Sequence, residues 1–145
     1  MTASSTRVLL DTCAVIWLAN SDPLSSEASR AIGQAGLAEG VLVSPISAWE
    51  IGLLSRPKRG GRDSLEFRPD PKTWFSRFMA SSVMRLAVIT PDIAIEASHL
   101  PGDLHSDPAD RLIIATARSL GATIISRDPK ILAYAEAGFV EAIAC

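Results

Sequence analysis

Short apolar runs alternate along this chain with longer segments in which apolar residues recur at helical spacing. The runs are rich in Val, Ile and Leu, as is typical of strands buried in a parallel sheet. They predict strands over residues 7–10, 41–43, 86–89, 122–126 and 139–143. The segments between them predict helices over residues 14–19, 25–36, 46–55, 71–81, 91–100, 108–120 and 129–137. Strands that alternate with helices indicate βαβ units, so we expect an α/β fold with a parallel sheet.

The segment from residue 107 to residue 128 is the most informative of these units. Asp107 precedes a proline and is the expected N-cap of the helix that follows, because proline is favoured at the first helical position. Asp110 falls in the first turn, on the same face as the apolar residues three and four positions further on. Gly121 ends the helix, and the next strand leads to Asp128. The unit therefore predicts two carboxylates, Asp110 and Asp128, near one edge of the sheet.

Two further acids are expected at the same edge. Asp11 comes directly after the first predicted strand, and Glu50 lies on a helix among apolar neighbours, where an unpaired charge is costly. In open parallel sheets the functional crevice lies outside the carboxyl ends of the strands. Carboxylates gathered there repel one another and raise one another's pKa, a conflict that a hard divalent cation such as Mg²⁺ resolves. Such a cation activates a bound water and stabilises charge on a phosphodiester.

Composition narrows the class of protein. The chain has 145 residues, of which 48% are hydrophobic and 21% charged, enough for one domain with a core. A net charge of −2 excludes a global basic field of the kind that drives sequence-independent nucleic-acid binding. The two cysteines make no disulfide framework. Without a run of about 18 apolar residues, no membrane segment is expected, and we expect a cytoplasmic protein.

Several motifs together resemble a known family. They are D-T at residues 11–12, W-E-I at 49–51, H-x-D-P-x-D-R-L-I-I-A-T-A at 105–117 and I-I-S-R-D at 124–128. In this order they are similar to the PIN-domain ribonucleases, and in particular to the VapC-type toxins of prokaryotic toxin–antitoxin pairs. The resemblance runs from about Val8 to Asp128. It implies one PIN domain over residues 1–145, with a three-layer α/β architecture in which helices flank a parallel five-stranded sheet.

The resemblance also implies an activity and a site. The activity is Mg²⁺-dependent endoribonuclease cleavage, with Mn²⁺ as a possible substitute, restrained by a VapB-like antitoxin; a homodimer is expected. The family's acidic site corresponds here to Asp11, Glu50, Asp110 and Asp128. We expect Asp11 and Asp110 to contact the metal, and Asp128 and Glu50 to act directly or through waters. Auxiliary roles are open to Thr12 and Asp107.

Other residues carry weaker signals. A polar loop after residue 55 contains four basic residues that could hold RNA phosphates, or could simply be solvated. They are Arg56, Lys58, Arg59 and Arg62. His99 and His105 have no matching Ser or Cys nucleophile, so we expect them to be structural or at the surface. The three tryptophans, Trp17, Trp49 and Trp74, are expected as core or interface anchors.

Two other functional classes stay open. A catalytically silent PIN-like binding module would share the fold but cleave nothing. A phosphatase of the haloacid-dehalogenase kind would use an Asp after the first strand as a nucleophile. That family's pattern has a second Asp two positions on, where this chain has Cys13. We expect the nuclease, because the phosphatase pattern is broken and all four acids of the nuclease site are present.

Overall fold

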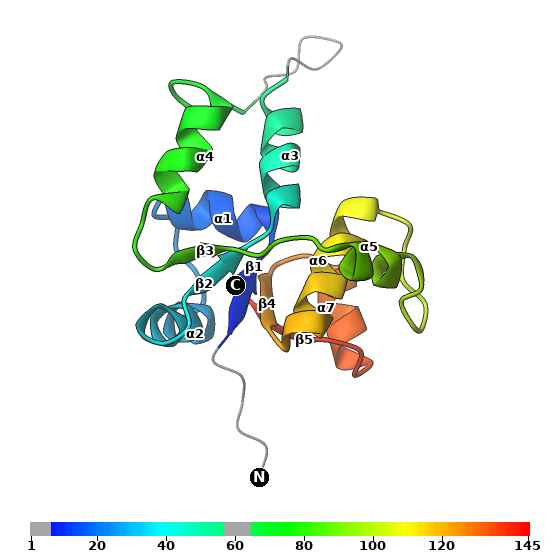
Figure 1. Ribbon diagram of the computed structural model, residues 1–145. Coiled ribbons are helices and arrows are strands. Elements are labelled where there is room, and N and C mark those ends of the chain that lie inside the picture. The colour runs from blue at the N-terminus through cyan, green and yellow to red at the C-terminus, as the bar shows by residue number, and fades with distance from the viewer. Residues whose placement is uncertain (1–6, 57–64) are drawn as a thin grey trace.

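The computed structural model describes residues 7–56 and 65–145, in which strands and helices alternate (Figure 1). The strands are β1 (Val8–Leu10), β2 (Val41–Val43), β3 (Met84–Leu86), β4 (Thr123–Ser126) and β5 (Glu141–Ala144). The helices are α1 (Thr12–Ala19), α2 (Ser26–Leu37), α3 (Pro45–Leu54), α4 (Pro71–Met79), α5 (Pro91–Ser98), α6 (Pro108–Leu120) and α7 (Pro129–Glu136).

The five strands form one sheet in the order β3-β2-β1-β4-β5. Every neighbouring pair is parallel, and Val8 in the central strand β1 is paired with Val41 of β2 and Thr123 of β4. The predicted parallel five-stranded sheet is thus confirmed. Because all strands run the same way, their carboxyl ends share one edge, and the segments that leave β1, β2 and β4 start side by side.

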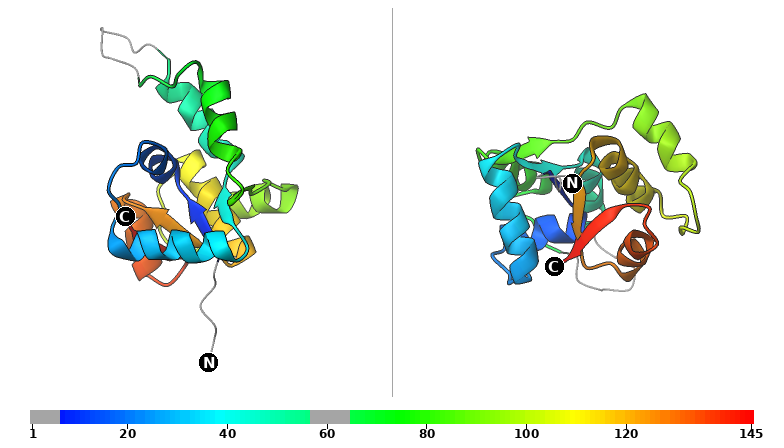
Figure 2. Two further views of the ribbon diagram at one scale, coloured as in Figure 1. Left: turned by 90° about the vertical axis from the view of Figure 1, so that its left-hand side faces the viewer. Right: turned by 90° about the horizontal axis from the view of Figure 1, so that it is seen from below.

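Helices cover both faces of the sheet and make a three-layer structure (Figure 2). Leu9 and Ile124 point to one face, where they pack in a core with residues of α5, α6 and α7. Their neighbours Leu10 and Ile125 point to the other face and pack with residues of α1 to α4. The alternation follows from the two-residue period of a strand. The predicted α/β class is therefore confirmed, with an apolar core on each side of the sheet.

Most of the described helices begin with the same local sequence pattern. Five helices begin with proline after a polar residue whose side chain accepts a hydrogen bond from a main-chain N–H of the first turn. The capping residues are Ser44, Asp70, Thr90, Asp107 and Asp128. This arrangement satisfies N–H groups that have no partner inside the helix. At the other end of α6, Gly121 takes a left-handed conformation with φ of 63°, as predicted for a helix stop.

Two strands lie elsewhere than expected. The strand predicted at residues 86–89 is β3, which pairs with β2 through Met84–Leu86 instead. The apolar run misleads because β3 is an edge strand, where Leu86 is 52% exposed and Val88, beyond the strand, 62% exposed. The strand predicted at 139–143 is displaced to β5, since the Phe139 ring stacks on Tyr134 before the strand begins.

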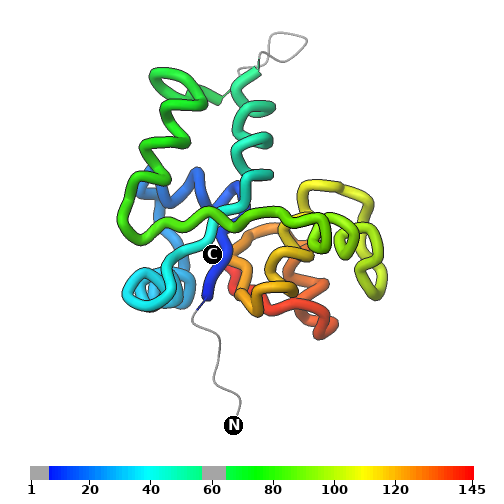
Figure 3. The backbone as a smooth tube through the Cα atoms, viewed as in Figure 1, coloured from blue at the N-terminus to red at the C-terminus, as the bar shows by residue number. Residues whose placement is uncertain are grey.

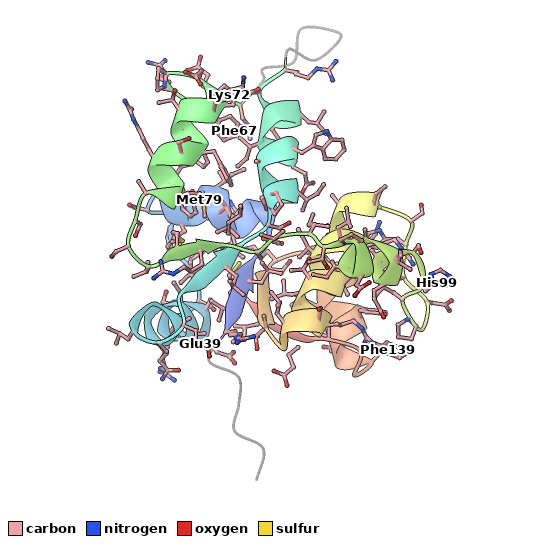
Figure 4. The ribbon with its side chains drawn as sticks, viewed as in Figure 1. Glu39, Phe67, Lys72, Met79, His99 and Phe139 are labelled. Atoms are coloured by element: carbon pink, nitrogen blue, oxygen red, sulfur yellow. The ribbon has the colours of Figure 1, made fainter. Side chains whose placement is uncertain are left out.

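Helices α3 and α4 project beyond the edge of the sheet as a pair, as the backbone tube shows (Figure 3). Phe67 lies between them (Figure 4) and is buried, with its ring edge-on to Trp74 at a centroid distance of 4.9 Å. This packing fixes the direction of α3, which carries Glu50. Within the described residues, no helix combines the length and the apolar character needed to cross a membrane.

Candidate active site

Asp11 is the most buried carboxyl group of the predicted site, with an exposed fraction of 6%. It directly follows β1 and caps α1, accepting the Ala14 N–H through Oδ1 at 2.8 Å. Its Oδ2 accepts the hydroxyl of Ser126, the last residue of β4, at 2.5 Å. Burial raises the pKa of Asp11, and these two hydrogen bonds oppose the rise by stabilising the charged form. The carboxylate is therefore held rigidly at the junction of the two central strands.

Glu50 reaches the same edge from α3. Its Oε1 accepts a hydrogen bond from the hydroxyl of Thr12, which also lies 3.1 Å from the Ser47 hydroxyl. Partial burial raises the pKa of Glu50, the Thr12 hydrogen bond lowers it, and the negative charge of Asp107 raises it further. Thr12 thus orients Glu50, which explains how a charged residue is tolerated on this helix face.

Asp110 and Asp107 approach from the start of α6. Asp107 is exposed and caps the helix, accepting the Ala109 N–H through Oδ1 at 3.0 Å. Asp110 is partly buried, and its pKa is raised to about 7, first by desolvation and then by repulsion from Asp107, Asp128, Glu50 and Asp11. Asp107 therefore caps the helix as predicted, and Asp110 lies in the pocket, on the helix face that it shares with apolar residues.

Asp128 completes the set of four acids. It caps α7, accepting the Lys130 N–H through Oδ1 at 2.9 Å. Its own main-chain N–H donates to the Ser126 hydroxyl oxygen at 3.0 Å. One serine thus bridges Asp11 and Asp128, and fixes their separation.

These side chains line one pocket of about 370 Å³ at the carboxyl edge of the sheet. Its described lining is Asp11, Thr12, Cys13, Trp17, Glu50, Asp107, Asp110, Arg127 and Asp128. All four predicted acids and both predicted auxiliary residues are present. A larger hollow of about 700 Å³ lies between α2, α7 and β5 and contains none of them. We therefore take the smaller pocket as the site on the strength of its chemistry.

The donor chemistry of this pocket fits a hard divalent cation, which takes carboxylate and hydroxyl oxygens with some waters. A cation would also relieve the repulsion that raises the pKa of Asp110. As the side chains stand, no three His, Cys, Asp or Glu groups in residues 7–56 and 65–145 surround a common ion position. The pocket therefore offers oxygen atoms of the kind that such a cation takes, but its described side chains do not converge on one ion position.

Four residues of this region make contacts that the sequence analysis did not predict. Ser126 occupies the end of a buried strand, where a polar residue is itself a signal. Arg127 and Trp17 line the pocket and stack on each other. His105 was expected to be structural or at the surface, yet its Nε2 lies 3.2 Å from Oδ2 of Asp110, without the alignment of a hydrogen bond.

Of the four basic residues predicted after residue 55, one lies within the described residues. Arg56 is exposed at the end of α3 and does not line the pocket. Lys58, Arg59 and Arg62 lie outside the described residues. Their contact with RNA stays a prediction.

The raised pKa of Asp110 predicts a dependence of stability on pH in the metal-free protein. Its ordinary pKa is 3.8 and its pKa in the fold about 7, so its contribution to stability is complete below about pH 4 and is lost as pH rises through 7. With EDTA present, we expect the free energy of unfolding by urea to fall by about 1 kcal/mol between about pH 5.5 and 7.5, allowing for solvent screening of a partly buried group. Asp110→Asn should remove that part of the fall; an unchanged pH dependence in this variant would contradict the assignment.

Comparison with known proteins identifies the family of this chain. The family model described as PIN domain matches residues 8–137. Ribonuclease VapC22 of Mycobacterium tuberculosis is 32% identical over 130 residues, which are 89% of this chain and 92% of that protein.

Solved structures share the fold at lower identity. VapBC2 from Rickettsia felis, bound to a DNA fragment from its promoter, aligns with a TM-score of 0.67 and 11% identity over 95% of this chain and 98% of its own. VapBC-5 from M. tuberculosis aligns with a TM-score of 0.60 and 19% identity, over 97% of this chain and 100% of its own. VapC20 from M. tuberculosis, described as a sarcin-ricin loop cleaving toxin, aligns with a TM-score of 0.54 and 20% identity, over 92% of this chain and 97% of its own. The chain therefore belongs to the PIN domain family and is a VapC-type member of it.

Proposed function

We propose that this protein is a divalent-cation-dependent endoribonuclease and the toxin of a type II toxin–antitoxin pair. One observation carries the proposal: acids from four distant parts of the sequence, Asp11, Glu50, Asp110 and Asp128, line a single pocket. Family membership and the ribonuclease name of the 32% identical relative support it. The cation that we propose is Mg²⁺, with Mn²⁺ as a substitute, and the compartment is the cytoplasm.

In this proposal Asp11 and Asp110 hold the cation, while Asp128 and Glu50 act directly or through waters. When bound, the cation would supply a water of lowered pKa and neutralise charge that develops on the phosphodiester. In such a hydrolysis the attacking water would give a proton to a carboxylate of the pocket as its oxygen bonds to phosphorus, and the leaving oxygen would take a proton from solvent as its bond to phosphorus breaks. Ser126 and the Ala14 N–H restrict Asp11 to one orientation, and Thr12 does the same for Glu50.

The partners we propose are an antitoxin and a second copy of the chain. Structural neighbours are described as VapBC toxin–antitoxin complexes, some of them bound to DNA. On this chain, α3 exposes Trp49 and Leu53, with exposed fractions of 55% and 40%, and such apolar groups suit coverage by a partner. Co-purification with the product of an adjacent small open reading frame tests the first partner, and sedimentation equilibrium the second.

The proposed activity is tested by incubating the purified chain with single-stranded RNA, with Mg²⁺ or with EDTA. We expect internal cleavage with Mg²⁺ and none with EDTA. A silent binding module would retain RNA without cutting it. A phosphatase would release phosphate from a small ester such as p-nitrophenyl phosphate and leave RNA intact, so each alternative gives a different result.

A further inference from the structure

Arg127 occupies a distinctive place in the acidic pocket. Of the residues known to line it, Arg127 alone is basic, and five others carry carboxyl groups. It directly follows β4 and is exposed, so its charge faces solvent at the pocket rim. A phosphodiester that approaches the carboxylates is repelled by them, and Arg127 supplies a positive charge in the lining of the same pocket.

The guanidinium group of Arg127 is held in place by the Trp17 ring, by two main-chain carbonyl oxygens and by the side chain of Cys145. Its central carbon lies 3.7 Å from the centroid of the Trp17 ring, a cation–π arrangement. Its Nε donates to the carbonyl oxygen of Cys145 and its Nη2 to that of Pro23, at 2.5 and 3.3 Å. A guanidinium group has five N–H donors, so donors remain beyond those that these contacts use. The side chain is thus oriented in advance and keeps donors for a ligand.

We propose that Arg127, stacked on Trp17, binds a backbone phosphate of single-stranded RNA next to the phosphodiester that is cut. The inference rests on the proposed function and adds a substrate-binding residue to it. A planar guanidinium with free N–H groups suits a phosphate, and its stacked position reduces the entropy lost on binding. Trp17, expected from sequence as a core or interface anchor, then serves to position Arg127.

A purely structural role is the competing explanation, because Arg127 also joins Cys145, just after β5, to Pro23, between α1 and α2. The two roles differ in their dependence on salt. A phosphate contact releases counterions when it forms, whereas a contact inside the protein does not change the number of phosphates bound. The test therefore measures affinity for RNA over a range of salt concentrations.

The parent protein for this test is the double variant Asp11→Asn/Asp110→Asn. It reduces the negative charge of the pocket and is expected to abolish cleavage, so that the RNA stays intact. Binding of a short fluorescein-labelled single-stranded RNA of random sequence is followed by fluorescence anisotropy at several KCl concentrations. Arg127→Gln in this background should weaken binding about 10-fold and reduce the slope of log affinity against log salt by about 0.7, the value for one phosphate of a single strand.

Two further variants complete the test. Arg118→Gln is the matched control, because Arg118 is also exposed and also donates to a main-chain carbonyl, that of Phe139, but lies in the last turn of α6, at the opposite end from Asp110. It should change neither affinity nor slope. Arg127→Lys should keep the slope, because the charge remains, and lose part of the affinity, because the planar stacked group is gone.

The outcomes separate the inference from the proposed function. If Arg127→Gln leaves the slope unchanged, or lowers it no more than Arg118→Gln does, the inference fails, while RNA cleavage by the wild-type protein preserves the proposed function. If the slope of log affinity against log salt falls as far in Arg127→Lys as in Arg127→Gln, the cause is displacement of the segment around Cys145, and the inference is overturned. Absence of both RNA binding and wild-type cleavage overturns the inference and the proposed function together.

Discussion

Asp110→Asn is expected to reduce the rate of RNA cleavage by about 10²- to 10³-fold, with the fold intact. Asn has nearly the same shape as Asp but carries no negative charge, so the pocket loses a proposed ligand of the cation. Stability should not suffer at neutral pH, because the pKa of Asp110 is raised to about 7 and its charged form is the strained one. The measurement is the cleavage rate at saturating Mg²⁺, together with urea unfolding.

Asp92→Asn is the matched control for this variant. Asp92 lies in the first turn of α5, as Asp110 lies in the first turn of α6, and both helices begin with proline. Each substitution removes a favourable interaction with the helix dipole, but only Asp110 lines the acidic pocket. Asp92→Asn should retain wild-type cleavage. A loss of similar size in both variants would attribute the effect to the helix start and would refute a catalytic role for Asp110.

Mg²⁺ is expected to raise the free energy of unfolding of the protein by a large amount. A ligand that binds only the folded state at 100 times its dissociation constant raises the free energy of unfolding by about 2.7 kcal/mol. The increase should be larger near pH 7.5 than near pH 5.5, because protonation of Asp110 competes with cation binding below its pKa of about 7. Urea unfolding with and without Mg²⁺ measures it.

Two comparisons make the Mg²⁺ result specific. KCl at matched ionic strength controls for general screening of the negative charges. The double variant Asp11→Asn/Asp110→Asn should lose most of the Mg²⁺ effect while remaining folded. Equal stabilisation of wild type and double variant would place the cation elsewhere on the surface and would contradict the proposed site.

The sequence predicted the helix starts well because they depend on neighbouring residues only. Asp107 was predicted as a cap from the proline that follows it, and it is confirmed as one; Asp128 also precedes a proline and caps α7 in the same way. The approach of the four acids was also predictable, since the parallel topology brings residues at strand ends to a common edge. Their roles in metal binding and catalysis stay predictions.

What the sequence did not predict depends on contacts between distant segments. The hydrogen bond from Ser126 to Asp11 joins residues 115 positions apart, and the stacking of Arg127 on Trp17 joins the segment after β4 to helix α1. No pattern among neighbouring residues predicts either contact. The start of β3 was missed for a related reason: which residues of an edge segment pair depends on the neighbouring strand, and the most apolar stretch was not the one that paired.

Three of the pocket's acids, Asp11, Asp107 and Asp128, also cap helices. Asn and Ser cap helices about as well as Asp does. A single Asp→Asn or Asp→Ser change at Asp11 or Asp128 would therefore remove a proposed catalytic carboxylate and leave the helix start capped. Under the proposed function, loss of activity in such a variant does not require loss of the fold.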